Sequence, residues 1–487
     1  MSDLTFPPPQ QKGPEQQIPM WLILGLVVVM ILAGGLVGYV LLSQKHDKEA
    51  GPTYPTAWDA RILPYVEIAE KERGLTFLHP VAVRFLGDKE FEKAVTSDKS
   101  KLDKDQRKEL EQVTGLFRAL GLLAGNVDLF DAFNAARGAG TLAYYSSEDH
   151  EIVIRGRAIT PAGRPTVVHE LTHVLQDQHF LIGDRLEKLQ KANAKHVSTE
   201  YDVFDAIVEG DATRVEADYV KTLPAAQQRA LAATQEQQSK DAYRGIPKVV
   251  VTMFTSPYAL GQAMVQAAAA TGGNAAVDAL FRDPPTHDSV MLDPLAGLDT
   301  PDRPDKVAVP ALRSGEKEFE SGEFGALSLY FVLAERMPVV DALAAIDGWN
   351  GDAFVGFDRN GTTCVRSAVR GDTDQATARL LGALRTWAAG SPGSSAKVAR
   401  DGALVRFESC DPGTKTALGR DASIQALQTV TIRSQLGAEF VKAGLPTEAA
   451  RCSADTVVRS FPFSTLTASK LSAADTNRVR SIVLSCR

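Results

Sequence analysis

The sequence is poor in cysteine and histidine, with 4 and 8 of them among 487 residues. It has no surplus of positive charge either, since 53 lysines and arginines face 60 aspartates and glutamates, for a net charge of -7. A protein that binds DNA or RNA through a basic surface is therefore not expected. Hydrophobic residues make up 44% of the chain and charged residues 23%. This balance excludes a disordered protein, and the length predicts about three domains.

The few cysteines all lie in the last quarter of the chain, far from the histidines discussed below. No serine or cysteine lies in a recognisable nucleophile motif. An even number of cysteines predicts two disulfide bonds in an oxidising compartment. We expect Cys364 to pair with Cys410 and Cys452 with Cys486, because each pair brackets one compact segment. Four buried free thiols in a cytosolic protein are the alternative.

One hydrophobic run near the start of the chain is long enough to cross a membrane. Residues 19–42 contain no charged side chain, and a helix of this length spans about 30 Å of hydrocarbon. We expect a transmembrane helix there, between a short cytoplasmic tail at 1–18 and a linker at 43–60. A cleaved signal peptide is the alternative, but polar and basic residues directly follow the run. The expected location is the cell membrane, with the catalytic domain on the extracytoplasmic side, as the predicted disulfides require.

A histidine pair on a predicted helix carries the candidate chemistry. The sequence reads His169-Glu170-Leu-Thr-His173, so that two imidazoles project from one helix face, one turn apart. Zinc binds imidazole nitrogen at about 2.1 Å, and Glu170 would point toward an open coordination position. The surrounding valines and leucines predict that the helix is buried. A polar set inside such a helix indicates a metal site rather than core histidines.

A catalytic zinc site requires a third protein ligand. The next predicted amphipathic helix carries Glu209, 36 residues after His173, within an apolar stretch. A carboxylate in such surroundings is costly unless it is paired or bound to metal. We therefore predict Glu209 as the third ligand, with Asp205, Asp211 and Glu216 of the same helix as alternatives.

These motifs resemble those of the gluzincin zinc metallopeptidases, in which a HExxH helix is followed by a second helix that donates a glutamate. Residues 169–180 (HELTHVLQDQHF), 208–212 (VEGDA) and 284–294 (PPTHDSVMLDP) together look like a bacterial group of membrane-anchored members. The resemblance covers residues 61–413 and implies a zincin-like domain that uses Zn²⁺. The better-known gluzincins have an aspartate four residues after the ligand glutamate, where this chain has Thr213.

Zinc chemistry and the resemblance predict hydrolysis of a peptide bond by a metal-activated water, with Glu170 as the general base. His287, in a proline-rich loop, is predicted to stabilise the oxyanion, with Tyr258 and Tyr219 as alternatives. Asp177 either fixes the tautomer of a ligand imidazole or lies on the helix surface. One of the two strands before the helix either pairs with an extended substrate or is an ordinary sheet strand.

The expected fold is α+β and mainly helical. It has the transmembrane helix, a zincin-like metallopeptidase domain with a short β-sheet at 61–413, and a small helical module at 421–487. A hairpin of strands at 141–146 and 151–155 is expected before the histidine helix, and residues 354–412 predict a strand, a helix and a strand. The leading hypothesis is a zinc peptidase acting on a peptide or protein. The alternatives are a zinc amidase acting on cell-wall peptides, and a non-proteolytic cell-envelope binding or scaffold protein with a structural or silent zinc site.

Overall fold

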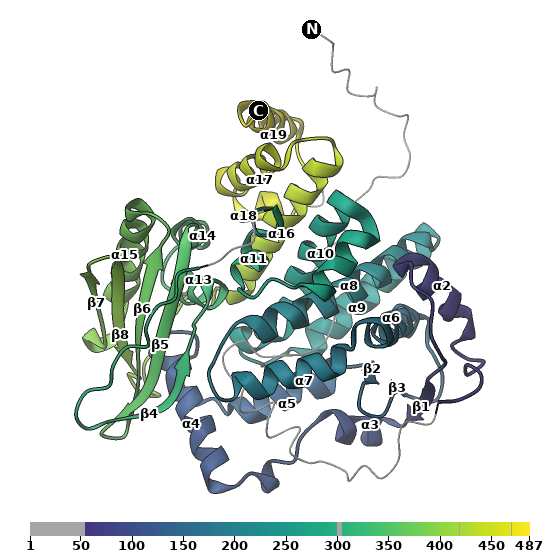
Figure 1. Cartoon of the computed structure of the whole chain (residues 1–487), viewed down its shortest axis with the longest axis horizontal. Coiled ribbons are helices and arrows are strands. Elements are labelled where there is room, and N and C mark those ends of the chain that lie inside the picture. Colours follow the sequence, from purple (N-terminus) through teal and green to yellow (C-terminus); the bar gives the residue numbers. More distant parts are fainter. Residues whose placement is uncertain (1–53, 300–303, 418, 469) are drawn as a thin grey trace.

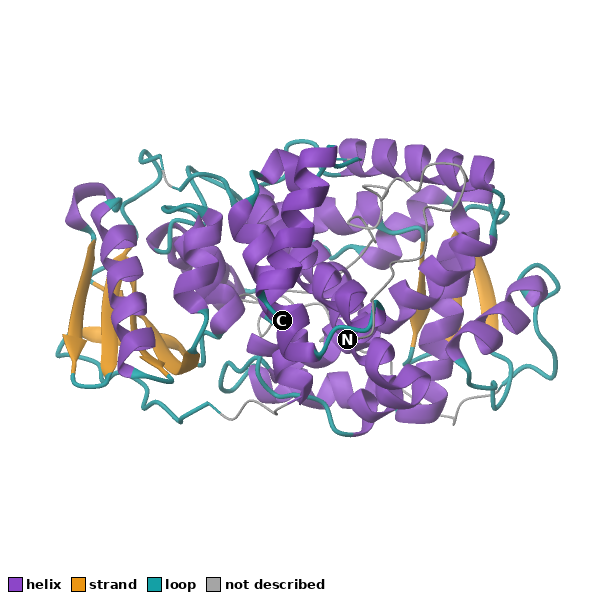
Figure 2. Ribbon diagram, turned by 90° about the horizontal axis from the view of Figure 1, so that it is seen from above, coloured by secondary structure: helices purple, strands orange, loops and turns teal. Residues whose placement is uncertain are grey.

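The computed structural model of the chain describes residues 54–299, 304–417, 419–468 and 470–487. In these ranges the protein has an α+β fold dominated by helices, as predicted. Two small sheets lie at opposite ends of a helical body (Figures 1 and 2).

The predicted membrane location requires correction. Within the described part of the chain, no helix combines the length and the apolar character needed to cross a bilayer. The predicted span at 19–42, the tail at 1–18 and residues 43–53 of the linker lie outside the described residues. A cell-membrane location is therefore not carried forward.

The helices begin at signals that the sequence contains. Asp103 and Gln106 form a capping box at the start of α4, and the side chain of Thr373 caps α15. In chain order the helices are α2 (Leu63–Arg73), α3 (Asp88–Val95), α4 (Lys104–Ala119), α5 (Leu129–Gly140), α6 (Arg164–Phe180), α7 (Ile182–Asn193), α8 (Glu200–Thr222), α9 (Ala225–Ala242) and α10 (Lys248–Arg282). They continue with α11 (Ser289–Leu292), α12 (Pro294–Asp299), α13 (Ala326–Ala334), α14 (Val339–Ile346), α15 (Asp374–Ala389), α16 (Ser423–Lys442), α17 (Thr447–Ser460), α18 (Phe463–Leu466) and α19 (Ala473–Ser485).

The smaller sheet lies beside α6 and has the strand order β1-β3-β2. Its strands are β1 (Ala82–Leu86), β2 (Ala143–Ser146) and β3 (Glu151–Arg155). The predicted hairpin of β2 and β3 is confirmed, and β1 adds to it in parallel with β3. Strand β2 is an edge strand, whose preceding residue Leu142 accepts a hydrogen bond from Arg155 in β3 at 2.9 Å. Because main-chain groups alternate in direction along an antiparallel strand, those of Ala143 and Tyr145 face away from β3.

The larger sheet is antiparallel, with the strand order β4-β5-β6-β8-β7. Its strands are β4 (Glu316–Gly322), β5 (Trp349–Arg359), β6 (Thr362–Gly371), β7 (Ala396–Asp401) and β8 (Leu404–Cys410). Cys364 of β6 forms a disulfide bond with Cys410 directly opposite in β8. A second disulfide joins Cys452 of α17 to Cys486 at the end of α19. Both predicted pairings are confirmed.

Helices α8 and α10 form the centre of the core, and their backbones touch. A Cβ atom on Gly261 would lie 1.9 Å from a carbonyl oxygen of α8, and one on Gly210 would lie 2.1 Å from the carbonyl carbon of Gly261. The sequence predicts a helix start near Pro257, but α10 runs through it. Proline removes one backbone donor, and the hydroxyl of Ser256 donates to the carbonyl of Met253 at 3.2 Å instead.

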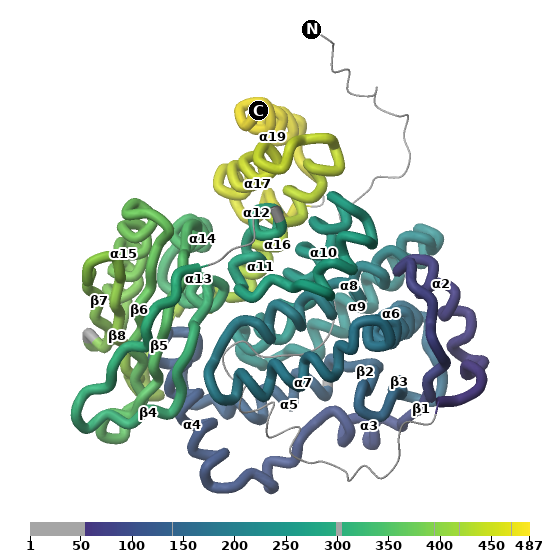
Figure 3. The backbone as a smooth tube through the Cα atoms, in the orientation of Figure 1, coloured from purple at the N-terminus to yellow at the C-terminus, as the bar shows by residue number. Residues whose placement is uncertain are grey.

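The C-terminal helices share this core. Helix α16 packs along α10, and its Ala426, Leu427 and Val430 belong to the central hydrophobic cluster. Figure 3 shows α17 and α19 beyond α16, on the outer side of the body. The separate module at 421–487 and the domain boundaries stay predictions.

Candidate metal centre

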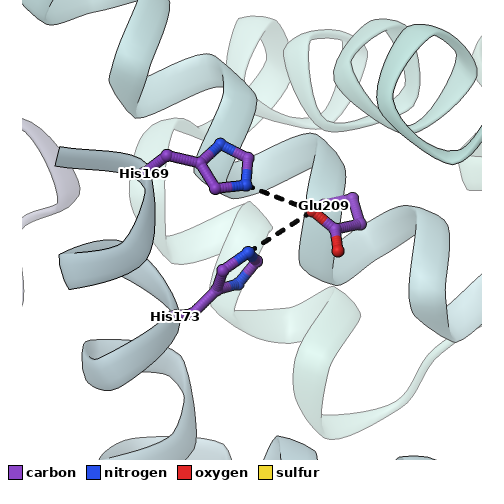
Figure 4. A group of neighbouring side chains, drawn as sticks. All are labelled: His169, His173 and Glu209. Carbon is purple, nitrogen blue, oxygen red and sulfur yellow. Dashed lines mark hydrogen bonds and ion pairs between the residues drawn. The ribbon is translucent and has the colours of Figure 1, made fainter. Parts of the chain in front are cut away.

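Two helices bring the three predicted ligands together. His169 and His173 extend from α6 toward Glu209 of α8 (Figure 4). Nε2 of His169 lies 3.2 Å, and Nε2 of His173 3.3 Å, from the same oxygen, Oε2 of Glu209. Ligand atoms bound tetrahedrally to zinc at about 2.0–2.1 Å lie about 3.3 Å apart. The three atoms, all within 4.8 Å of one another, could therefore hold one metal ion, and no fourth histidine, cysteine or acid joins the group among the described residues.

The charges of the three side chains are strongly coupled. Burial alone would raise the pKa of Glu209, but the charge of His173 and hydrogen bonds with both histidines lower it to about 2. Burial alone would lower the pKa of His169 and His173, but contacts with Glu209 raise both. The carboxylate is thus ionised, as a metal ligand must be. Metal binding requires neutral imidazoles and releases the protons that Glu209 holds on them.

Each ligand imidazole has a partner on its other nitrogen. Nδ1 of His173 donates to Oε1 of Gln176 at 2.9 Å, and the amide of Gln176 donates to the carboxylate of Asp211 at 3.1 Å. Nδ1 of His169 lies 3.2 Å from a carboxylate oxygen of Glu216, at ion-pair distance. The hydrogen bond to Gln176 fixes the orientation of the His173 ring and leaves its Nε2 for a metal ion. Nδ1 of His169 makes no hydrogen bond among the described residues, so Glu216 acts on this ring through its charge.

The other acids of α8 have different roles. Asp211 is fully buried and accepts from Arg73 of α2 at 2.5 Å, which ties α2 to α8 behind the site. Asp205 is buried beside Glu209, and burial, with a smaller contribution from the Glu209 charge, raises its pKa. Only Glu209 of the acids considered as third ligands reaches both Nε2 atoms. Glu216 supports the site from behind His169.

Glu170 is buried next to the first ligand. Burial raises its pKa, although the charges of His169 and His173 and a hydrogen bond from the backbone of Tyr145 oppose this rise. A carboxyl group whose pKa is raised toward neutrality is suited to take up and return a proton. The contact with Tyr145 also shows that the outward edge of β2 faces Glu170. Strand β3 lies inside the sheet, so in the described part of the chain β2 alone of the two predicted strands is an edge strand at the site.

The structure does not bring His287 to this site. Its Nδ1 lies 3.0 Å from Oε1 of Glu323. The next residue, Asp288, donates its backbone N–H to the hydroxyl of Thr199 at the start of α8. Thr199 precedes Glu209 by ten residues, or roughly 15 Å along a helix. The structure therefore places His287 beside Glu323 rather than among the three ligands, and its proline-rich loop leads to the start of α8. Its catalytic role stays a prediction.

Tyr258 of α10 lies in the site instead. Its ring stacks on that of His169 with centroids 6.0 Å apart, and its hydroxyl forms a hydrogen bond with Glu209. The close approach of α8 and α10 makes this contact possible. Tyr219, the other alternative, packs against Tyr65 in a small hydrophobic cluster.

The carboxylate of Asp177 contacts the β2–β3 hairpin rather than a ligand imidazole. Its carboxylate accepts from the hydroxyl of Tyr145 at 2.8 Å and from the backbone of Gly183 at 3.0 Å. Gln176, one position earlier, contacts the ligand imidazole. Gln176 was not predicted from the sequence, because an amide is a less obvious partner for a ligand imidazole than a carboxylate. The usable signal is its position three residues after His173, on the same helix face.

No protein-family model matches the chain, and comparisons with curated proteins and with solved structures found no match. The resemblance to gluzincins therefore rests on the sequence motifs alone, and functional inference rests on the geometry of the site.

Glu216 provides a test of how His169 is oriented. Glutamine at this position keeps the shape of the side chain but removes the charge beside Nδ1, and we expect zinc affinity to fall about 10-fold or more. A competition titration with a chromophoric chelator measures the change. The matched control is Glu200→Gln, an exposed position on the same helix. Equal affinities of Glu216→Gln and wild type would show that Glu216 does not support the ligand.

Proposed function

We propose that the protein is a zinc-dependent peptidase with a zincin-like active site. The observation that carries this proposal is the convergence of two imidazole nitrogens and a carboxylate oxygen beside a buried glutamate with a raised pKa. Structural zinc sites usually have four protein ligands, whereas catalytic sites have three and keep one position open. The three ligands here favour catalysis over a scaffold with a structural zinc ion.

The residues of the site suit hydrolysis by an activated water. A bound zinc ion would lower the pKa of water toward 7 and polarise the scissile carbonyl. Glu170 takes a proton from the water as the oxygen bonds to the carbonyl carbon, and passes this proton to the amide nitrogen as the C–N bond breaks. Tyr258, rather than His287, is the residue proposed to donate a hydrogen bond to the developing oxyanion.

The free edge of β2 supports a peptide as the substrate. The main-chain groups of Ala143 and Tyr145 face away from β3, and Tyr145 contacts Glu170. An extended peptide can add to such an edge as a further strand, and the antiparallel direction gives the straighter hydrogen bonds. The substrate is therefore expected to be an extended or unfolded segment.

Metal removal and return test this function. The purified protein is stripped with a chelator, incubated with reduced and alkylated casein, and assayed by mass spectrometry before and after one equivalent of zinc is added. We expect no cleavage of the stripped protein and full recovery with zinc. Cleavage of cell-wall peptides alone would favour the amidase. Zinc binding without hydrolysis of any amide would contradict the proposal.

A further inference from the structure

Arg137, in the last turn of α5, is a cation without an acidic partner among the described residues. Its side chain is only partly exposed, and it forms no hydrogen bond or ion pair within the described part of the chain. A guanidinium group cannot lose its proton in a protein. Withdrawing such a charge from water without an acidic partner is costly. An anionic group bound beside Arg137 would offset this cost.

The packing of α5 on α10 brings Arg137 near Tyr258, which lies beside the metal centre. The rings of Phe133 and Phe254 join the two helices, with centroids 5.7 Å apart. Arg137 follows Phe133 by one helical turn, and Tyr258 follows Phe254 by one turn. The ring of Tyr258 in turn stacks on a ligand imidazole. The Arg137 charge also interacts with Tyr258 and with Tyr201 of α8, while desolvation lowers its pKa.

Arg137 also lies where the edge strand begins. Its carbonyl accepts hydrogen bonds from the backbone and the hydroxyl of Thr141 at 3.3 and 2.9 Å, and β2 starts two residues later. Tyr145, toward the other end of β2, contacts Glu170. A peptide that pairs antiparallel to β2 therefore extends its C-terminal side away from Glu170 and toward Arg137. Tyr145 lies four positions after Thr141, or roughly 13 Å along an extended chain.

We propose that Arg137 binds a carboxylate of the substrate, on the C-terminal side of the scissile bond. This inference rests on the proposed function. A carboxylate accepts two parallel hydrogen bonds from a guanidinium and supplies the missing negative charge. The carboxylate is either the C-terminus of the peptide or the side chain of an aspartate or glutamate near it.

Binding without turnover provides the test. Full-length, zinc-loaded protein carrying Glu170→Gln is titrated by calorimetry with three forms of one N-acetylated hexapeptide chosen from the mapped casein cleavages. These are the free acid, the C-terminal amide, and the amide with a glutamate in the last position. If casein is not cleaved, a hexapeptide pool in the same three forms replaces it. We expect at least one carboxylate form to bind about 10-fold more tightly than the plain amide. The form that does so shows whether Arg137 binds the C-terminal carboxylate or a side-chain carboxylate.

Three substitutions then show whether Arg137 causes the preference for carboxylate peptides. Arg137→Met should abolish the difference in affinity between the carboxylate and amide peptides. Arg137→Lys should keep part of this difference, because lysine has the positive charge but not the two parallel N–H donors of the guanidinium. The matched control is Arg229→Met, at an exposed position of α9, which should keep the full difference. Equal weakening of acid and amide by Arg137→Met would point to an oxyanion or structural role and overturn the proposal, as would no effect on either.

The two proposals can fail separately. Selective, Arg137-dependent binding of carboxylate peptides by a protein that hydrolyses none of them would overturn the peptidase function and support the role of Arg137. Zinc-dependent cleavage with no preference for a carboxylate would support the peptidase and overturn the role of Arg137. Thermal unfolding of each variant shows whether it is folded.

Discussion

Glu170→Gln is expected to lower kcat/KM for peptide cleavage by about 1,000-fold while the protein keeps its zinc. Glutamine has the shape of glutamate but cannot accept the proton of the attacking water, and general-base catalysis typically contributes 10²–10⁴-fold. The side chain is buried, and a neutral amide costs less to desolvate than a carboxylate. The substitution should therefore not lower the stability of the folded protein. Cleavage of a fluorogenic peptide measures the rate, and elemental analysis measures the zinc content.

The matched control for this variant is Glu236→Gln, at a partly exposed position of α9 where Glu236 pairs with Lys240, and it should retain both cleavage and zinc. Unchanged cleavage by Glu170→Gln would show that another group activates the water or that a contaminating peptidase is responsible. Loss of zinc from Glu170→Gln would instead show that Glu170 is itself a ligand.

Glu209→Ala is expected to weaken zinc binding by about 1,000-fold or more and to abolish cleavage. The substitution removes one of three ligands and the only carboxylate that reaches Nε2 of both His169 and His173 within the described residues. It also removes the negative charge that lowers the cost of placing a divalent cation in a buried site. The dissociation constant is measured by competition with a chromophoric chelator of known affinity.

Asp205→Asn is the matched variant for the ligand assignment, because Asp205 lies one turn before Glu209 and is also enclosed, with 4% of the residue exposed against 14% of the Glu209 side chain. It should retain zinc. Loss of zinc from Asp205→Asn, with retention by Glu209→Ala, would reverse the assignment of the third ligand.

Local sequence patterns were sufficient to predict the two helices that carry the predicted ligands. The spacing of His169 and His173 requires a helix for the two imidazoles to share a face, and the apolar positions around Glu209 predict α8 for the same reason. The β2–β3 hairpin and the two disulfide pairs were also predicted correctly, because each depends on residues within one segment.

Contacts between segments far apart in the sequence were harder to predict. His287 was predicted from its residue type and loop, but the packing of that loop on Thr199 at the start of α8 decides its position. Tyr258 reaches the site because Gly210 and Gly261 allow α8 and α10 to touch. Strand β1 pairs with β3 at a sequence separation of 69 residues, as in Ala82 with Glu151, and no local pattern encodes such a pairing.

Diffraction data collected on both sides of the zinc absorption edge, from crystals of protein supplied with Zn²⁺, test the central claim most directly. The expected result is one strong anomalous peak, present only above the edge, about 2.1 Å from Nε2 of His169, Nε2 of His173 and a carboxylate oxygen of Glu209. No peak at this position, or a peak coordinated by other residues, would contradict the metal centre on which the proposed hydrolysis depends.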